Sequence, residues 1–503
     1  MWEEGAQWGM RRDDEDPGLP IKLGPASNGE YLPEPLSPVV TEAIRRAREE
    51  CDRNARRLGM SRREFLLSIC ASAVTLSALD ACTGEAARRP PGGRYRIPAP
   101  ATTEPEAAHH AIGGEEFVLD VQGHLLEYDL NPAAHAAGGL GSDFWNRFPQ
   151  QGCGESDPRV CFDIEHFMSE IFLKSDTNMV VLSALPIAPA GSALSPKIME
   201  ETRVVAERLC HDERVLLHAQ VLPNVGPLRT NLDEMERHAR AYPIKAWKVF
   251  THYPDLYLHN GQGWRLDDRG RGVPKVGDAF IRKAIELGVP IIASHKGLSG
   301  GSLLASPDDV GGAARTHPDA KFLVYHSGFE TSITEGPYSM AAKTSGVNRL
   351  ITTMRENGIG PNGNVYAELG STWWYLMRTP DQAAHVLGKL LKYVGEDNVI
   401  WGTDSIFYGS PQDQIHALRA FEITKEYQDR YGYPELTREL KAKILGLNGA
   451  KLYGVDPVSV PCTFTRRDLE RIRRSLPGSN RTLGPATASE TATFVASHQG
   501  WPG

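Results

Sequence analysis

Short apolar runs recur along the chain from residue 117 onward, and longer polar segments separate them. Each run is rich in β-branched or aromatic residues, is apolar on both faces and is bounded by Gly, Pro, Asn or Asp. This pattern is typical of strands that are buried on both sides of a sheet. The runs predict eight strands, at residues 117–121, 179–185, 215–222, 246–250, 289–293, 322–325, 365–369 and 399–401.

Between these runs, apolar residues return every three or four positions, which predicts amphipathic helices. The predicted helices lie at residues 197–210, 232–241, 279–287, 304–316, 348–356, 382–393 and 437–453. Strands alternating with helices predict a parallel α/β fold, and eight units over about 340 residues fit a (β/α)8 or TIM barrel. A doubly wound sheet would need a Gly-x-Gly-x-x-Gly turn after the first strand, where this chain reads Gln122-Gly123-His124.

The chain on either side of the barrel, which we place at residues 115–456, lacks this alternation. Residues 1–40 are rich in Pro, Gly and acidic side chains, which predicts disorder, and residues 41–63 contain eight arginines at helix-compatible spacing, so residues 1–60 form a disordered, basic N-terminal region in this prediction. Residues 83–114 contain Pro-Pro-Gly-Gly and further prolines, which predicts a flexible linker. Residues 457–503 are rich in Ser, Thr, Pro and Gly and predict a tail.

Residues 61–82 begin with Ser-Arg-Arg-Glu-Phe-Leu and continue as an uncharged run of fifteen residues up to Leu79. A basic start, a short apolar run and then small residues are typical of an export signal, because a membrane-spanning helix needs about 20 apolar residues. The paired arginines resemble a twin-arginine translocation signal, which implies export by that machinery to the periplasm, the cell envelope or the medium. A basic amphipathic helix is the alternative. Cys82 loosely fits a lipid-anchor site, and Met60 offers a second start.

The composition excludes some classes of function. The net charge is -8, from 55 basic and 63 acidic residues, and no concentrated basic patch offers a nucleic-acid surface. The seven cysteines are scattered and include no Cys-x-x-Cys pair, so they indicate neither a disulfide scaffold nor a thiolate metal site.

Chemically reactive side chains follow most of the predicted strands. In a (β/α)8 barrel the carboxyl ends of the strands share one rim, and active sites lie there. Imidazole and carboxylate groups at this density suit a divalent metal such as zinc, with an open position for a water molecule whose pKa the metal lowers. The side chains at this rim are His124, Lys248, His295, His326, Glu368 and Asp404.

These motifs resemble the amidohydrolase superfamily, in particular its family 2, the amidohydrolase-related branch that contains the aminocarboxymuconate-semialdehyde decarboxylase type. The resemblance covers about residues 117–455. It rests on Asp120-x-Gln122-x-His124, His295, His326-Ser327-Gly328, Gly402-Thr403-Asp404 and Leu447-Asn448-Gly449-Ala450-Lys451-Leu452-Tyr453.

The resemblance implies a metal-dependent hydrolase barrel in which His124, His295 and Asp404 bind one divalent metal. It also implies two catalytic residues. His326 would polarise the substrate or transfer a proton, and Asp404 would activate the metal-bound water. Gln122 departs from the family pattern, which has a His there, and an amide oxygen is a weaker, neutral ligand. We therefore expect zinc with Gln122 as a weak ligand, with manganese or no metal as the alternatives.

Three further residues extend the predicted site toward the substrate. Lys248 would bind a substrate carboxylate, and its alternative is an ion pair with Glu368, which we also place near the substrate. Trp373 would stack on a ring, and its alternative is packing of a long loop. The stretch 251–276 has the length of an active-site lid, with a surface insertion or an oligomer contact as alternatives.

The sequence thus predicts a metal-dependent hydrolase that acts on a small carbonyl or carboxylate compound, cyclic or aromatic in our weak preference. A non-oxidative decarboxylase of the same branch is the alternative. A metal-free lactonase or a non-catalytic ligand-binding barrel is the second alternative, and Gln122 is its only support. The expected partners are a small-molecule substrate and the export machinery, without nucleic acid, and the sequence leaves a homo-oligomer open.

Overall fold

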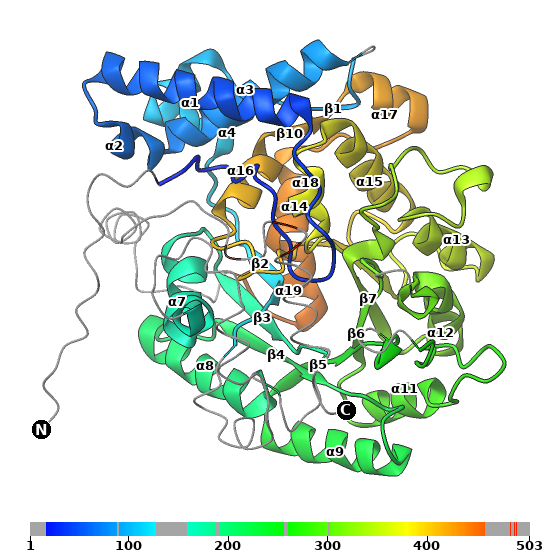
Figure 1. Ribbon diagram of the computed structural model, residues 1–503. Helices are drawn as coiled ribbons and strands as arrows, with labels where there is room; N and C mark the ends of the chain where they lie inside the picture. Colours follow the sequence, from blue (N-terminus) through cyan, green and yellow to red (C-terminus); the bar gives the residue numbers. More distant parts are fainter. Residues whose placement is uncertain are drawn as a thin grey trace, which may run out of the picture.

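The computed structural model describes residues 17–87, 90–126, 158–186, 192, 194–255, 260–299 and 302–457, with single positions at 483, 487 and 489. Eight parallel strands form one sheet in which neighbours along the chain are also neighbours in space (Figure 1). The strands are β2 (Leu119–Gly123), β3 (Met179–Ser183), β4 (Val215–Gln220), β5 (Ile244–Val249), β6 (Ile291–His295), β7 (Lys321–Tyr325), β8 (Val365–Glu368) and β9 (Val399–Ile400). All eight overlap the predicted strands.

The sheet curls until its first and last strands meet. Val121 N donates to Trp401 O at 3.0 Å, and His124 N donates to Ser405 O at 2.6 Å. A parallel bridge between Gly123 and Ser405 completes this seam. The predicted (β/α)8 barrel is therefore confirmed.

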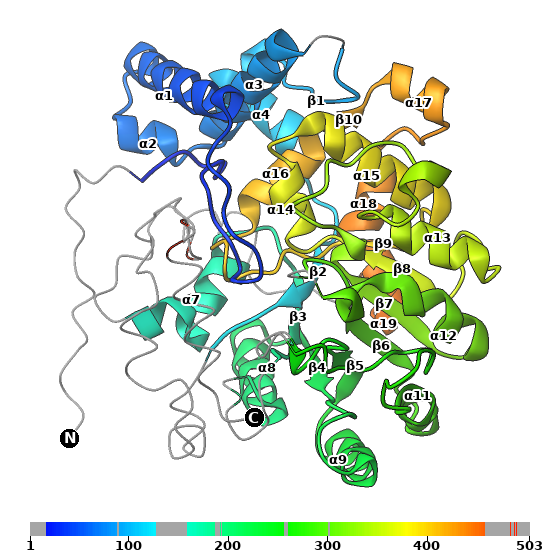
Figure 2. The ribbon, with the colours of Figure 1, turned by 45° about the vertical axis from the view of Figure 1, so that its right-hand side comes forward.

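Helices surround the barrel (Figure 2). They are α8 (Pro196–Cys210), α9 (Leu228–Ala241), α11 (Gly277–Glu286), α12 (Val310–Thr316), α13 (Asn348–Glu356) and α15 (Pro380–Tyr393), and a closing run passes from α18 (Arg438–Ala442) to α19 (Asn448–Tyr453). The shorter helices α7 (Ile164–Met168), α14 (Thr372–Leu376), α16 (Gln412–Ala420) and α17 (Lys425–Tyr431) lie in the connections. The helix predicted at 304–316 starts as 3-10 turns and becomes α-helical only at Val310, because Pro307 interrupts it.

Side chains along each strand alternate between the barrel interior and the outer helices. On β5, Ala246 packs in the interior cluster, whereas Trp247 packs in the outer core. Lys248, two residues after Ala246, therefore points into the barrel. On β6, Ala293 packs in the interior cluster, so His295, two residues later, also points into the barrel. The strands thus bring several of the predicted site residues into one interior.

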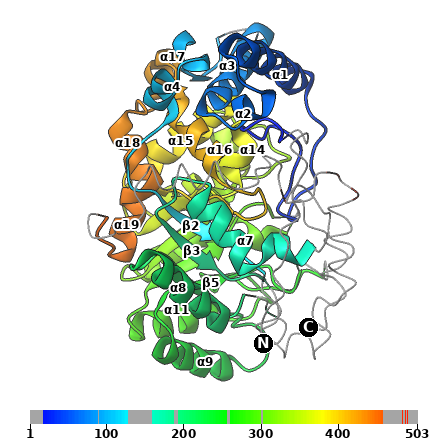
Figure 3. The same cartoon turned by 90° about the vertical axis from the view of Figure 1, so that its left-hand side faces the viewer.

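A helical layer precedes the barrel and packs on one side of it (Figure 3). It consists of α1 (Pro38–Leu58), α2 (Arg62–Leu66), α3 (Ile69–Ala86) and α4 (Pro105–Ile112), and β1 (Gly93–Tyr95) joins it to the barrel by antiparallel pairing with β10 (Phe421–Ile423). The linker predicted at 83–114 is therefore wrong, because its Pro- and Gly-rich segment finds a strand partner more than 300 residues later. Nearly all of the predicted tail 457–503 lies outside the described residues.

The apolar run of the predicted export signal lies within this layer. Helix α3 contacts α1, α4 and α16, and Leu76 and Leu79 are fully buried. Ser61 begins α2 with a reciprocal capping box in which Ser61 and Glu64 bond to each other's backbone N–H. None of the helices in the described ranges combines the length and the apolar character that spanning a bilayer requires. The role of residues 61–82 in export stays a prediction.

The segment 17–37, which we name the strap, runs from the helical layer down to the barrel mouth (dark blue in Figures 1 and 2). Leu19, Ile21, Leu23 and Ala26 are buried in the core. The disorder predicted for residues 1–40 is thus wrong from residue 17 onward, whereas α1 agrees with the helix-compatible spacing noted from residue 41. Residues 1–16 lie outside the described part. Local patterning could not reveal the strap, because its apolar side chains are buried against elements that are distant in the sequence.

Candidate active site

The predicted rim residues meet at the carboxyl end of the barrel. His124, Lys248, His295, His326, Glu368 and Asp404 are all almost completely buried. They form two neighbouring groups, one around Asp404 and one around His295 and His326.

Asp404 is the centre of the first group, and its two oxygens accept four hydrogen bonds or close polar contacts. Oδ1 lies 3.0 Å from Gln122 Nε2 and 3.1 Å from His124 Nε2. Oδ2 accepts from Ser371 Oγ at 2.5 Å and from Asn28 Nδ2 at 2.6 Å. Burial opposes the charged form, but the contacts from His124 and Ser371 outweigh it and hold the pKa of Asp404 well below its usual range. Asp404 is therefore a carboxylate and a weak base.

The contact between His124 and Asp404 tests whether a metal fits here. His124 Nδ1 lies 2.6 Å from the carbonyl oxygen of Ser183 and donates to it, so Nε2 is the ring nitrogen that faces Asp404. His124 Nε2 lies 3.1 Å from Asp404 Oδ1, and a proton or a metal ion between the two atoms would stabilise this contact. Two ligands of a tetrahedral ion with bonds of about 2.1 Å lie about 3.4 Å apart. The pair fits a divalent metal.

The side chain of Gln122 also has a polar atom that lacks a partner. Its Nε2 donates to Asp404, while its Oε1 is buried without a hydrogen-bond partner. A buried acceptor without a partner costs about 1–3 kcal/mol. The amide oxygen is therefore available to a cation, although it is neutral.

The second group consists of two imidazoles whose centroids lie 4.7 Å apart, those of His295 and His326. His326 Nδ1 donates to Gly370 O at 2.7 Å, and Nε2 of both rings is buried without a hydrogen-bond partner. Burial lowers the pKa of His326 to about 4 and that of His295 well below its ordinary value. Both rings are therefore neutral at pH 7 and offer lone pairs.

Glu30 on the strap completes this group, and the sequence offered no signal for it. Its Oε1 lies 3.4 Å from His295 Nδ1, and its Oε2 lies 3.7 Å from His326 Nε2. Within the described ranges, these three residues form the set of His, Cys, Asp and Glu whose ligand atoms all lie within 4.8 Å of one another. Burial and the charge of Asp404 raise the pKa of Glu30 well above its usual range. The predicted set of His124, His295 and Asp404 stays a prediction.

Lys248 brings an ammonium group into the same interior. Its Nζ lies 3.2 Å from the centroid of the Tyr325 ring and 5.0 Å from that of Phe250, and this ammonium makes no hydrogen bond or salt bridge to a described residue. Burial lowers its pKa to about 7, although the charges of Glu30 and Glu368 oppose that shift. The alternative ion pair with Glu368 does not form.

Glu368 instead supports the backbone beneath His326. Its Oε2 accepts from His326 N at 3.0 Å, and its Oε1 accepts from Gly370 N. Burial raises its pKa to about 8. Glu368 thus holds the backbone that presents His326, and its predicted role toward the substrate stays a prediction.

Three residues around the site have left-handed backbones. The φ angles are 63° at His326, 53° at Ser371 and 62° at Asp404. Such a conformation costs a residue other than Gly about 1–3 kcal/mol and persists where surrounding contacts impose it. The hydrogen bond from Asp404 N to Gln122 O is one such contact, at 2.9 Å. The backbone is thus strained where it presents these side chains.

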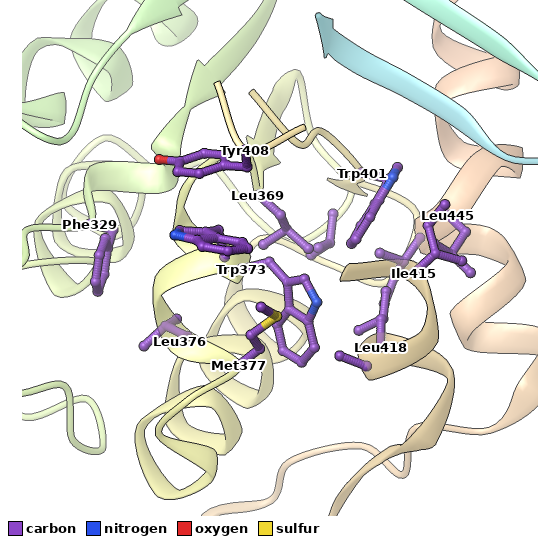
Figure 4. Close-up of a cluster of buried hydrophobic side chains, with 14 of the residues drawn as sticks. Phe329, Leu369, Trp373, Leu376, Met377, Trp401, Tyr408, Ile415, Leu418 and Leu445 are labelled. Carbon is purple, nitrogen blue, oxygen red and sulfur yellow. The ribbon is translucent and has the colours of Figure 1, made fainter. Parts of the chain in front are cut away.

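Trp373 lies away from the mouth, in the apolar cluster of Figure 4 with Leu376, Met377, Ile415 and Leu418. It is 1% exposed, and its Nε1 donates to Gln414 O at 2.9 Å. The structure therefore favours the packing alternative over stacking on a substrate.

The stretch after β5, predicted as a lid, packs closely against the rim where it is described. Trp264 is fully buried, and its N donates to Thr251 O at 2.8 Å. The ring of His252 lies 5.0 Å from that of His295, and both of its nitrogens are buried without a hydrogen-bond partner. His252 therefore borders the site. Residues 256–259 lie outside the described part.

Comparisons with known proteins place this geometry in a family. The amidohydrolase family model matches residues 199–455, which include β4 to β9, His295, His326 and Asp404. A comparison with curated proteins found no match.

Solved structures with a related fold share little sequence with this chain. The 5-carboxyvanillate decarboxylase LigW from Sphingomonas paucimobilis is 13% identical over 68% of this chain and 100% of its own, with a TM-score of 0.41. An uncharacterised TIM-barrel protein from Bordetella bronchiseptica is 13% identical over 67% and 98%, with a TM-score of 0.39. A dihydroxybenzoic acid decarboxylase from Polaromonas sp. JS666, with bound manganese and the inhibitor 2-nitroresorcinol, is 14% identical over 68% and 97%, with a TM-score of 0.35.

The family model spans half of the chain, the strand order closes a (β/α)8 barrel, and the site residues gather at the carboxyl ends of its strands. The chain therefore belongs to the amidohydrolase family.

Proposed function

We propose that this protein is a metal-dependent decarboxylase that removes CO2 from a small carboxylic acid. The observation that carries this proposal is the buried ammonium of Lys248, which lies among ring faces and bonds to no described carboxylate. A buried ammonium without a hydrogen-bonded carboxylate is costly, and a substrate carboxylate would supply that partner.

His124, His295 and Asp404 would hold the metal, with the unpaired Oε1 of Gln122 as a weak further ligand. When bound, a divalent metal polarises substrate oxygens and stabilises negative charge that develops on them. The neutral rings of His295 and His326 can ligate without first losing a proton.

The state of Asp404 favours decarboxylation over hydrolysis. A hydrolase needs a base that takes a proton from water, and such a base works best when its pKa lies near the working pH. Asp404 has contacts on both oxygens and a lowered pKa, so it would hold charge and not accept a proton. Decarboxylation asks for no such base.

Decarboxylation does require a proton, because the bond from carbon to carboxylate breaks, its electron pair stays on carbon and CO2 leaves. Lys248 with a pKa of about 7 is a far stronger acid than an ordinary lysine and would give that proton to the carbon. The imidazole of His326 keeps its proton at Nδ1 on Gly370 O, so it would orient the substrate and not protonate it.

Hydrolysis of a carbonyl compound is the second candidate. The contact between His124 and Asp404 favours it, because a metal held there would lower the pKa of a bound water. A metal-free lactonase or a binding barrel would leave the buried nitrogens of His295 and His326 without a function.

The proposal is tested with the purified full-length chain supplied with zinc or manganese. It is incubated with a panel of 13C-carboxyl-labelled aromatic and unsaturated acids and, separately, with lactones and amides. We expect labelled CO2 from at least one acid and its loss in Lys248→Met. Release of acid from the lactones or amides, without CO2 from any carboxylic acid, would replace this proposal with the hydrolase.

A further inference from the structure

We infer that Glu30, which the strap carries into the barrel mouth, is a metal ligand of this protein together with His295 and His326. This inference rests on the proposed function only in requiring that the barrel bind a divalent metal. It adds a ligand from outside the barrel, because the strap ends about 80 residues before β2, the first strand of the barrel.

The strap is a fixed part of the barrel mouth. The ammonium of Lys22 lies 3.1 Å from Asp413 Oδ1 and donates to Ser410 O at 2.6 Å, and Lys22 N donates to Asp413 Oδ2 at 3.2 Å. The hydroxyls of Tyr31 and Tyr408 are hydrogen bonded at 3.0 Å. This ion pair and the buried apolar side chains of the strap fix it to the barrel loops that it contacts. Glu30 is thus presented in a fixed position.

Asn28 connects Glu30 to the predicted metal ligand Asp404. Its Nδ2 donates to Asp404 Oδ2 at 2.6 Å and to Glu30 Oε2 at 2.5 Å, and its Oδ1 accepts from Glu30 N at 2.9 Å. Hydrogen bonds of this kind orient the carboxylates of metal sites. One side chain therefore orients both acidic groups toward the same mouth.

The distances around Glu30 match a set of ligands better than a set of hydrogen bonds. Its oxygens lie 3.4 Å and 3.7 Å from the facing nitrogens of His295 and His326, beyond the usual range for a charged hydrogen bond. They are close to the separation of about 3.4 Å expected for neighbouring ligands on a tetrahedral ion. His326 Nε2 is fully buried, has no hydrogen-bond partner and faces Glu30. An ion between these atoms would satisfy all three.

The charges of the site lead to the same conclusion. Gln122 contributes a neutral amide, and its Nε2 is already engaged with Asp404. Asp404 alone would leave a divalent ion with one uncompensated charge in a buried site, which is costly. The carboxylate of Glu30 would add a second negative charge beside the ion.

The experiment compares four forms of the full chain: the unmodified protein, Glu30→Gln, Glu30→Gln combined with Gln122→His, and Glu34→Gln. The Glu30→Gln change keeps size and shape but removes the charge. Glu34 lies on the same strap and accepts from Tyr375 OH at 3.0 Å outside the His cluster, so it is the matched control. Zinc and manganese affinities are measured by competition with a chromophoric chelator, bound metal by elemental analysis, and folding by thermal unfolding with and without metal.

We expect Glu30→Gln to weaken metal binding at least tenfold, Glu34→Gln to leave it unchanged, and the added Gln122→His to restore most of the loss. Unchanged metal affinity in Glu30→Gln would overturn the inference. It would also be overturned if this variant kept its metal and turned over substrate faster, since Glu30 would then be an occupant of the substrate site. If metal binding depends on Glu30 but no acid releases CO2, the result would refute only the proposed function.

Discussion

Asn28 and Asp404 are separated by 376 residues in sequence, yet Asn28 Nδ2 donates to Asp404 Oδ2 at 2.6 Å. This bond joins the strap to the residue that follows the last strand of the barrel. The site is thus assembled from both ends of the described chain, and the barrel alone does not complete it. The proposed role of the strap in metal binding can therefore be measured.

Asn28→Ala removes the donor shared by Asp404 and Glu30 and leaves the other contacts in place. We expect metal affinity to fall about 10- to 100-fold, as is typical when a group that orients a ligand is lost. Chelator competition measures the effect. Asn231→Ala is the control, since that exposed amide donates only to Val225 O and Pro227 O. An affinity equal to that of the unmodified protein would show that the bond does not orient the ligands.

His124→Ala and Asp404→Ala test the predicted metal ligands themselves. Each change should remove bound metal, because it deletes a ligand atom of the proposed site. The fold should survive, since the barrel core does not depend on these side chains. Elemental analysis gives the metal content, and near-ultraviolet circular dichroism follows the packing. Full metal retention in both variants would refute the assignment of these two ligands.

The pKa of Lys248, lowered to about 7 by burial, predicts the pH dependence of catalysis. Below pH 7 the group is an ammonium that holds a carboxylate and can give a proton, and above pH 7 it becomes a neutral amine. We therefore expect kcat/KM for a carboxylic acid to fall about tenfold per pH unit above that pKa. Lys248→Met should lower activity and abolish this limb. Lys425→Met, at an exposed position, should leave the profile unchanged. A limb that persists in Lys248→Met would assign it to another group.

The buried pair of Lys296 and Asp309 should contribute to stability and not to chemistry. Lys296 Nζ lies 2.8 Å from Asp309 Oδ2, and both side chains are fully buried. Asp309→Ala leaves an uncompensated ammonium inside the protein, and we expect it to lower the free energy of unfolding by about 3–5 kcal/mol. Asp429→Ala breaks an exposed pair with Lys425 and should cost about 0.5 kcal/mol or less. Urea denaturation measures both, and equal effects would contradict the argument from burial.

Export by the twin-arginine route predicts that the protein leaves the cytoplasm when Arg62 and Arg63 are intact. Fractionation of cells should find the unmodified protein outside, and Arg62→Lys with Arg63→Lys should remain inside. The matched control changes Arg56 and Arg57 at the end of α1 to lysine. Equal distribution of all three forms would reject the signal.

The same experiment bears on the strap. Cleavage after residue 82 would remove α1, most of α3 and the strap, and with them Glu30. If Glu30 binds metal, the mass of the exported protein must therefore show that residues 17–82 are retained. A shorter exported chain that still binds metal at full affinity would contradict the role of Glu30.

The sequence by itself determined the barrel and most of its rim. Strands buried on both faces must be apolar throughout, so β3 and β6 are visible as short runs without any knowledge of their neighbours. Because all parallel strands end on one side, His295 and Asp404 could be assigned to one site from their positions alone. These features depend on local periodicity, which a single sequence carries.

Only the tertiary structure decided which side chains surround the site. Glu30 lies in a segment without periodicity, and its contacts with His295 and His326 come from packing between distant parts of the chain. Trp373 has the residue type of a substrate platform but is buried in the outer core. Residue type and spacing state what a side chain can do, whereas long-range packing determines what it meets. For that reason the barrel was predictable and the strap was not.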